Sequence, residues 1–130
     1  PWCKYWFHVL HLLDARGKMS KSKGDFLTVS LLEEKGYAPL VYRMFCLQSH
    51  YRKPLTFSFE SLDNTATAYK KLVSRIAALK NEGEHDEAAM EPLRASFRAA
   101  LENDLNTSSA VRRTESQAFR RGQACAHQGV

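Results

Sequence analysis

A stripe of apolar residues with α-helical spacing is the feature that most limits how this chain can fold. It runs from Glu60 to about Lys80, and its members recur every three or four residues, which places them on one face of a helix. The charged residues of this segment lie elsewhere on the helix and form its solvated face. We expect a long helix that packs through Leu62, Tyr69, Leu72 and Ile76 against the helices before it. The whole stripe is Leu62, Ala66, Tyr69, Leu72, Val73, Ile76 and Leu79.

A second apolar stripe follows after a break in the pattern at Asn81–Glu84, which marks a boundary. Pro92 is early enough in this stripe to sit in the first turn of a helix. Asn106 or Thr107 can cap a further helix, but the apolar pattern for one does not develop, so none is expected. The residues of the second stripe are Met90, Leu93, Phe97, Ala100 and Leu101.

The first third of the chain predicts short extended pieces and then two helices. Val9–Leu13 and the segment after Gly17 suit two extended pieces joined by a turn over Asp14–Gly17. Thr28 can cap a helix over Val29–Lys35, which Gly36 ends. A second helix starts with Pro39 in its first turn and runs to about Ser49, and Pro54 makes His50–Ser58 an irregular or extended connection. The chain as a whole therefore reads as mainly α-helical.

Composition sets broad limits on the class of protein. The chain has 130 residues, a formal net charge of +5 and 44% hydrophobic residues, which suits one modest globular domain. The positive charge permits attraction to nucleic acid without requiring it. No apolar run approaches the roughly 20 residues that span a bilayer, and the start lacks a signal-peptide pattern.

The cysteines give no sign of a disulfide framework or of a metal site. They number three and lie far apart, at Cys3, Cys46 and Cys125, which favours a reducing, cytoplasmic setting. Cys46 lies in an apolar run and reads as a small buried hydrophobe. Cys3, His8 and His11 are not interpreted as metal ligands, because a zinc site needs a further donor and none is nearby.

The run Lys18-Met19-Ser20-Lys21-Ser22 suits a loop that closes over a polyphosphate. Lysine is a compact point charge on a flexible stem, so it can follow a phosphate that moves during a reaction. The two serine hydroxyls can donate hydrogen bonds to phosphate oxygens, and Gly24 lets the backbone bend at little steric cost. A solvated basic turn is the competing interpretation of such a cluster.

This run matches the signature loop of class I aminoacyl-tRNA synthetases, and its flanks resemble those of the cysteinyl-tRNA synthetases. The flanks include Tyr5-Trp6-Phe7-His8, Lys35-Gly36-Tyr37 and His50-Tyr51-Arg52 followed by Leu55-Thr56-Phe57-Ser58. Further on, the segment from Phe97 to Thr107 resembles an acidic Asn-Thr segment of that family. The resemblance covers about Lys4 to Val111, which is most of the chain.

The resemblance implies ATP-dependent activation of cysteine to cysteinyl-adenylate and its transfer to tRNA(Cys). It implies that Lys18, Ser20, Lys21 and Ser22 bind ATP, with Mg²⁺, and that Lys21 is the catalytic residue. Met19 reads as an apolar anchor of the loop. Tyr5, Trp6 and His8 are expected to pack the end of the catalytic domain, although aromatic residues there can also face adenine.

Departures from the family pattern limit what this chain can do by itself. Asp25 replaces the usual asparagine after the loop, which adds negative charge near a phosphate site and should weaken ATP binding slightly. The family's His-x-Gly-His element and its zinc ligands are missing from these residues. We therefore expect an internal fragment of a longer enzyme, with zinc bound elsewhere in that enzyme, and no aminoacylation by the 130-residue chain alone.

The resemblance also predicts how the chain is organised. Residues 1–28 would end a Rossmann-type catalytic domain and carry the loop, as a short extended or β remnant of that domain. A helical stem-contact region would cover residues 29–82, and residues 83–111 would start the next helical, tRNA-binding domain. Among residues 112–130 only Phe119 and Val130 are large and apolar, so this segment reads as a disordered or non-native tail, with a basic RNA-binding tail as the alternative.

Two other functions stay open at this point. The first is the related cysteine ligase of mycothiol synthesis, which shares the loop but joins cysteine to an amino sugar. The second is a non-catalytic helical module that touches tRNA through lysine and arginine contacts to phosphates.

Overall fold

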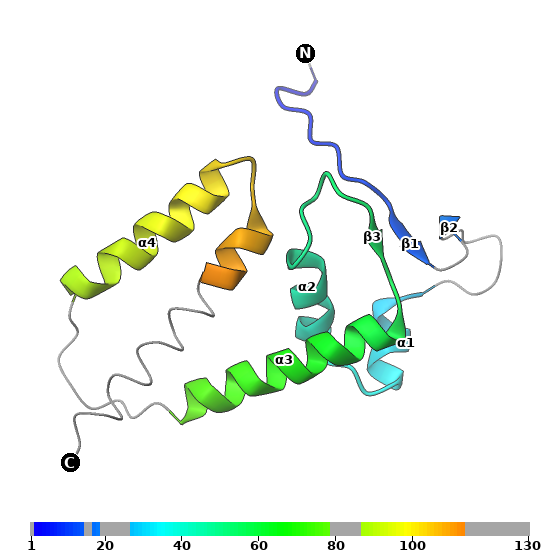
Figure 1. Ribbon diagram of the computed structural model, residues 1–130. Coiled ribbons are helices and arrows are strands. Elements are labelled where there is room, and N and C mark those ends of the chain that lie inside the picture. Colours follow the sequence, from blue (N-terminus) through cyan, green and yellow to red (C-terminus); the bar gives the residue numbers. More distant parts are fainter. Residues whose placement is uncertain (1, 15–16, 19–26, 79–86, 114–130) are drawn as a thin grey trace. The chain divides into compact units, whose positions relative to one another are not determined.

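The computed structural model describes residues 2–14, 17–18, 27–78 and 87–113 (Figure 1). It divides into two compact units, Pro1–Ala66 and Thr67–Val130, which are described separately. The elements are β1 (Leu12–Asp14), β2 (Gly17–Lys18), α1 (Val29–Glu34), α2 (Pro39–Leu47), β3 (Leu55–Thr56), α3 (Phe59–Ala77) and α4 (Glu87–Glu102). The prediction of a mainly helical chain with a short β part is confirmed.

The strands of the first unit form a small sheet in the order β2-β1-β3. The two predicted extended pieces form an antiparallel hairpin, in which Leu13 pairs with Lys18 and Asp14 with Gly17. On its other side β1 pairs in parallel with β3, so the connection predicted to be irregular or extended supplies a strand. Parallel neighbours need a crossover between them, and here α1 and α2 lie in that crossover.

Helices α1 and α2 begin and end close to where the sequence predicts. The side chain of Thr28 accepts a hydrogen bond from the backbone N–H of Leu31 (3.1 Å) and so caps α1. Gly36 follows α1 with φ of +87°, a left-handed conformation that costs glycine little. Pro39 occupies the first turn of α2, where its missing N–H leaves no helical bond unmade.

The core of the first unit gathers side chains from both short helices, β3 and the start of α3. Phe57 is 6% exposed and packs edge-to-face on Phe45 and Phe59, with ring centroids 5.9 and 5.3 Å apart. α1 also packs against α2. The other buried apolar residues of this core are Leu32, Val41, Met44 and Leu62.

Helix α3 is present as predicted, but its apolar stripe is buried only at its start. Leu62 is fully buried, whereas the exposed fraction reaches 46% at Val73 and 58% at Ile76. The prediction that the stripe packs through Ile76 is therefore wrong for this chain. The first unit ends at Ala66, so only the first two turns of α3 belong to the unit that contains α1 and α2.

The second unit contains α4 and a further helix over residues 107–113 (Figure 1). Pro92 lies inside α4 and not in its first turn, because the helix already includes Glu87. The expectation that no helix follows is also wrong. Asn106 Oδ1 accepts hydrogen bonds from the Ser109 N–H and the Ser108 hydroxyl, both at 3.0 Å, and so caps the new helix.

The reversal between those two helices takes two residues with positive φ, Asp104 (54°) and Leu105 (50°). Such a turn is not visible in a periodicity pattern, because it interrupts the stripe without a glycine or a proline. Residues 112 and 113 continue the capped helix, and residues 114–130 lie outside the described part. The interpretation of the tail therefore stays a prediction, as do the proposed domain boundaries.

Candidate functional site

The predicted phosphate loop leaves the sheet at β2. The backbone of Lys18 pairs with Leu13 at the end of the β1–β2 hairpin. Residues 19–26, which include Ser20, Lys21 and Ser22, lie outside the described residues. The roles assigned to these residues from the sequence stay predictions, and the structure gives the two ends that carry the loop.

The chain returns from the loop at Leu27 and enters α1 through the Thr28 cap. Thr28 also offers its backbone carbonyl to the N–H of Leu32 (3.2 Å), and Leu32 is 2% exposed. The return end is thus joined within one helical turn to a buried core residue.

Hydrogen bonds fix the hairpin to the core. The backbone N–H of Phe57 donates to the carbonyl of Leu13 (2.6 Å), which extends the parallel β1–β3 pairing by one step. The N–H of Leu10 donates to the carbonyl of Tyr51 (3.1 Å), so the segment before β1 lies beside the His50–Arg52 segment. Two sequence motifs about forty residues apart therefore meet at one sheet.

His50, Tyr51 and Arg52 form a compact cluster. The Tyr51 ring stacks on His50 and on Phe7, with centroids 4.8 and 4.6 Å apart. Arg52 Nε donates to the Tyr51 hydroxyl (2.8 Å), and the guanidinium carbon lies 5.4 Å from the Tyr51 ring centroid. The backbone N–H of Arg52 donates to His50 Nδ1 (3.2 Å), which leaves the proton of a neutral His50 ring on Nε2. The cluster holds an exposed cation in a defined position.

A second cluster joins the end of α1 to the start of α3. The hydroxyl of Tyr37 donates a hydrogen bond to Asp63 Oδ1 (2.5 Å), and the Tyr37 ring stacks on Phe59 with centroids 6.3 Å apart. Lys35 Nζ lies 5.3 Å from the centroid of the same Phe59 ring. The hydrogen bond to Asp63 raises the pKa of Tyr37, and desolvation and the carboxylate charge raise it further. Sequence reasoning did not identify this pair, because its members are 26 residues apart and follow no shared pattern.

A groove of about 380 Å³ opens between the end of α2, β3 and the start of α3. Thr65 is 4% exposed, and its hydroxyl donates to the Ser61 carbonyl (2.9 Å) and faces Gln48 Oε1 (3.3 Å). None of the residues that line the groove is charged, so the groove does not match a polyphosphate. Its lining residues are Phe45, Gln48, Ser49, Leu55, Ser61, Asn64 and Thr65.

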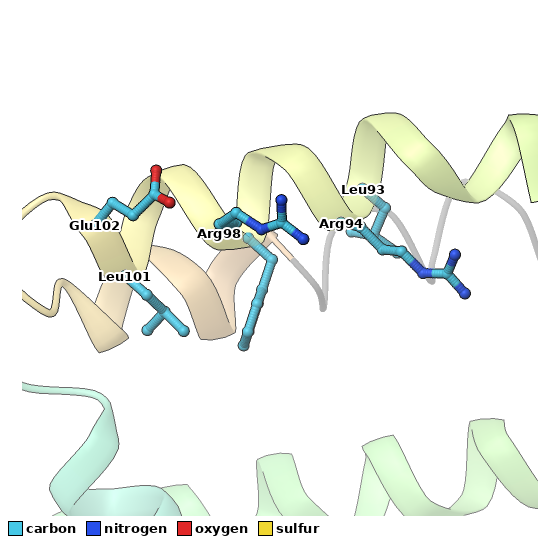
Figure 2. A pocket seen from close by; sticks show the side chains of 6 residues that line it. Leu93, Arg94, Arg98, Leu101 and Glu102 are labelled. Carbon is cyan, nitrogen blue, oxygen red and sulfur yellow. The ribbon is translucent and has the colours of Figure 1, made fainter.

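In the second unit a shallow pocket follows one face of α4 (Figure 2). Leu101 and Glu102 point to opposite sides of the helix. Arg94 forms a two-point ion pair with Glu87, so this cation already has a carboxylate partner. The pocket is lined by Leu93, Arg94, Phe97, Arg98, Leu101 and Glu102.

The aromatic residues before β1 differ from the expectation. Tyr5 and Trp6 are 88% and 66% exposed, so they do not pack against the described part of the first unit. Trp6 instead stacks on His8 and meets Trp2 edge-to-face, with centroids 6.2 and 5.2 Å apart. The ring contacts of Trp6 are thus with neighbours in sequence, whereas Phe7 stacks on Tyr51.

The thiols and carboxylates of the described residues do not assemble a metal site. No group of three or more histidine, cysteine, aspartate or glutamate side chains there is placed to hold an ion, so these residues do not fit the zinc expected for the family. Cys46 is half-buried, and desolvation raises the pKa of its thiol. Burial likewise raises the pKa of Tyr42, its neighbour one turn earlier in α2. Among the described helices, none combines the length and the apolar character needed to span a membrane.

Comparison with known proteins bears on what these elements do together. A family model for the catalytic domain of class I (C) tRNA synthetases matches residues 1–67. The chain is 41% identical over 112 residues to a cysteine–tRNA ligase of Novosphingobium aromaticivorans, covering 83% of this chain and 23% of that relative. It is 38% identical over 121 residues to one of Caldicellulosiruptor saccharolyticus, covering 85% and 26%. A cysteine–tRNA ligase of Zymomonas mobilis is 47% identical over 78 residues, covering 60% and 15%.

The chain thus spans about a quarter of the length of the first two relatives. The matched region contains the loop, both of its anchors and the His50–Arg52 cluster. The resemblance read from the loop and its flanks is confirmed. The chain belongs to the class I tRNA synthetases of the (C) catalytic-domain family.

Proposed function

We propose that this chain supplies the ATP-phosphate loop of a cysteine–tRNA ligase. In this reaction the carboxylate of cysteine attacks the α-phosphate of ATP, which gives cysteinyl-adenylate and releases pyrophosphate. The activated cysteine is then transferred to a hydroxyl of the terminal ribose of tRNA(Cys), and AMP leaves. The observation that supports the proposal is that the region matching the family contains the lysine-serine sequence, with Lys18 at a strand end before it and Thr28 at a helix cap after it.

Lys21 has the main chemical role in this proposal. Negative charge moves onto the departing pyrophosphate as the bond to the α-phosphate breaks. An ammonium group that meets this charge stabilises the transition state more than it stabilises bound ATP, and it therefore raises the rate. Lys18, at the fixed end of the loop, supports the outer phosphates.

Ser20 and Ser22 donate hydrogen bonds to phosphate oxygens in the closed loop. Mg²⁺ would accompany ATP and would offset part of the negative charge of its phosphates. Zinc belongs to a part of the enzyme other than the described residues, and no step proposed here passes through it. The partners of the whole enzyme are ATP, cysteine and tRNA(Cys), and its setting is the cytoplasm.

The decisive test is Lys21→Ala in a complete ligase that carries these 130 residues. Loss of one charge-stabilising donor typically lowers a rate by about 10²–10³-fold, so cysteine-dependent ATP–pyrophosphate exchange should fall by that factor. Cysteine binding, measured by equilibrium dialysis, should change little. Lys71→Ala is the matched control, because Lys71 is an exposed lysine of α3 and its loss should leave exchange unchanged.

A tenfold or smaller loss of exchange in Lys21→Ala would contradict the role of the loop. The acceptor is tested separately, by offering tRNA(Cys) and an amino sugar to the activated cysteine. Transfer to the amino sugar alone would favour the mycothiol-type ligase. Absence of exchange in the complete unmodified enzyme would favour a module that binds RNA without catalysis.

A further inference from the structure

The contacts that join the end of α1 to the start of α3 have a consequence for the loop. We call the set Lys35, Tyr37, Phe59 and Asp63 the α1–α3 latch. Its central contact is the 2.5 Å hydrogen bond from the Tyr37 hydroxyl to Asp63 Oδ1, with the Tyr37 ring stacked on Phe59. A hydrogen bond to an ionised carboxylate is stronger than one between neutral groups. The latch therefore fixes the segment after α1 on α3.

The latch lies at the opposite end of α1 from the loop. α1 has only six residues, so it is about 9 Å long. Its first turn carries the Thr28 cap, where the chain returns from the loop. The turn after its last residue is closed by the N–H of Gly36 to the Glu33 carbonyl (2.8 Å) and the N–H of Tyr37 to the Leu32 carbonyl (2.9 Å). Tyr37 and Thr28 are therefore hydrogen-bonded to the two ends of the same short helix.

Without the latch, α1 has one buried anchor. Leu32 is the buried residue of α1, and the other described residues of this helix are half-buried or exposed. α1 also packs against α2, and each further point of attachment fixes the orientation of so short a helix more closely. The latch supplies such a point on a different element, α3.

We propose that Tyr37 and Asp63 are positioning residues for the ATP-dependent step, because they set the orientation of α1 and with it the return end of the phosphate loop. This inference rests on the proposed function of the loop. Neither residue touches ATP in this scheme. Their effect on the reaction passes through α1 and should appear in ATP use and not in cysteine binding.

The test uses the complete ligase that carries these residues, with ATP–pyrophosphate exchange measured at varied ATP. Tyr37→Phe removes the hydroxyl and keeps the ring on Phe59, and Asp63→Ala removes the acceptor. Each should lower kcat/KM for ATP about fivefold, the effect of losing one modest hydrogen bond. The dissociation constant of cysteine should stay within twofold of its value in the unmodified enzyme. The thermal midpoint should stay within about 2 °C, since the Tyr37–Asp63 hydrogen bond is exposed to solvent.

Two further variants separate positioning from general damage. Asp63→Asn keeps an oxygen that can accept from the Tyr37 hydroxyl, so it should retain at least half of the activity. Tyr42→Phe removes a tyrosine hydroxyl from α2, away from the latch, and should leave kcat/KM for ATP unchanged. The effect of the double variant Tyr37→Phe, Asp63→Ala should be smaller than the sum of the two single effects, because both variants remove the Tyr37–Asp63 hydrogen bond.

The inference is overturned if Tyr37→Phe and Asp63→Ala keep kcat/KM for ATP within twofold. It is also overturned if Asp63→Asn is as impaired as Asp63→Ala, or if activity falls only in step with the thermal midpoint. Failure of the proposed function looks different. In that case the unmodified enzyme shows no ATP–pyrophosphate exchange, or the Lys21→Ala variant shows the same exchange rate as the unmodified enzyme.

Discussion

Truncation of Leu62 is the most direct test of where α3 is anchored. Leu62 has no exposed surface, so Leu62→Ala removes three carbon atoms from the core of the first unit. The transfer term is about 2 kcal/mol at roughly 0.8 kcal/mol for each carbon group. A residual cavity adds to this, and buried leucine truncations cost about 2–5 kcal/mol in total. We expect the free energy of unfolding to fall within that range.

The matched control is Ile76→Ala, on the same helix and in the same predicted stripe. Ile76 is 58% exposed, so its truncation leaves no enclosed cavity. The higher helix propensity of alanine offsets part of the remaining loss, and the cost should stay below about 1 kcal/mol. Urea unfolding followed by far-ultraviolet circular dichroism measures both variants, with equal m-values showing that the unfolded state is unchanged.

Equal losses in Leu62→Ala and Ile76→Ala would refute this reasoning. Such a result would mean that the whole stripe is buried in solution, as the spacing of its residues alone predicts. A loss confined to Leu62 would show instead that α3 is held only through its first two turns.

Two other outcomes follow from the structure and the sequence. Asn106→Ala removes the cap of the helix over residues 107–113 and should destabilise the second unit by about 1 kcal/mol. The loss should appear as faster amide hydrogen exchange in that helix. Unchanged exchange there would show that the cap is unimportant. The 130-residue chain alone should bind ATP more weakly than about 1 mM by calorimetry and should not charge tRNA, because its sequence does not contain the His-x-Gly-His motif of the family. Submillimolar affinity or measurable charging would contradict this.

The local elements of this chain could be predicted because their signals are local. The Thr28 cap, Gly36 after α1 and Pro39 at the start of α2 each act on a few neighbouring residues, and the structure contains all three as predicted. The phosphate-binding role of Lys18 to Ser22 rests on the order of these residues, which matches the signature loop of the family, and it stays a prediction. The family match confirms the resemblance that those residues carried.

Other features escaped prediction because they depend on partners or on unusual backbone conformations. Helical spacing places Ile76 on the same face as Leu62, but burial depends on whether another element covers that face. The turn through Asp104 and Leu105 needs two left-handed residues that no glycine announces, and so the helix after Asn106 was missed.

The sequence by itself therefore determined α1, α2 and the two extended pieces before them, since each follows from the preferences of adjacent residues. Only the tertiary structure decided which apolar residues are buried and which distant residues meet. The parallel pairing of Leu12 with Leu55 and the Tyr37–Asp63 hydrogen bond join residues that share no periodicity. Such contacts depend on how the whole unit packs, because two distant residues meet only when the helices and strands around them bring them together.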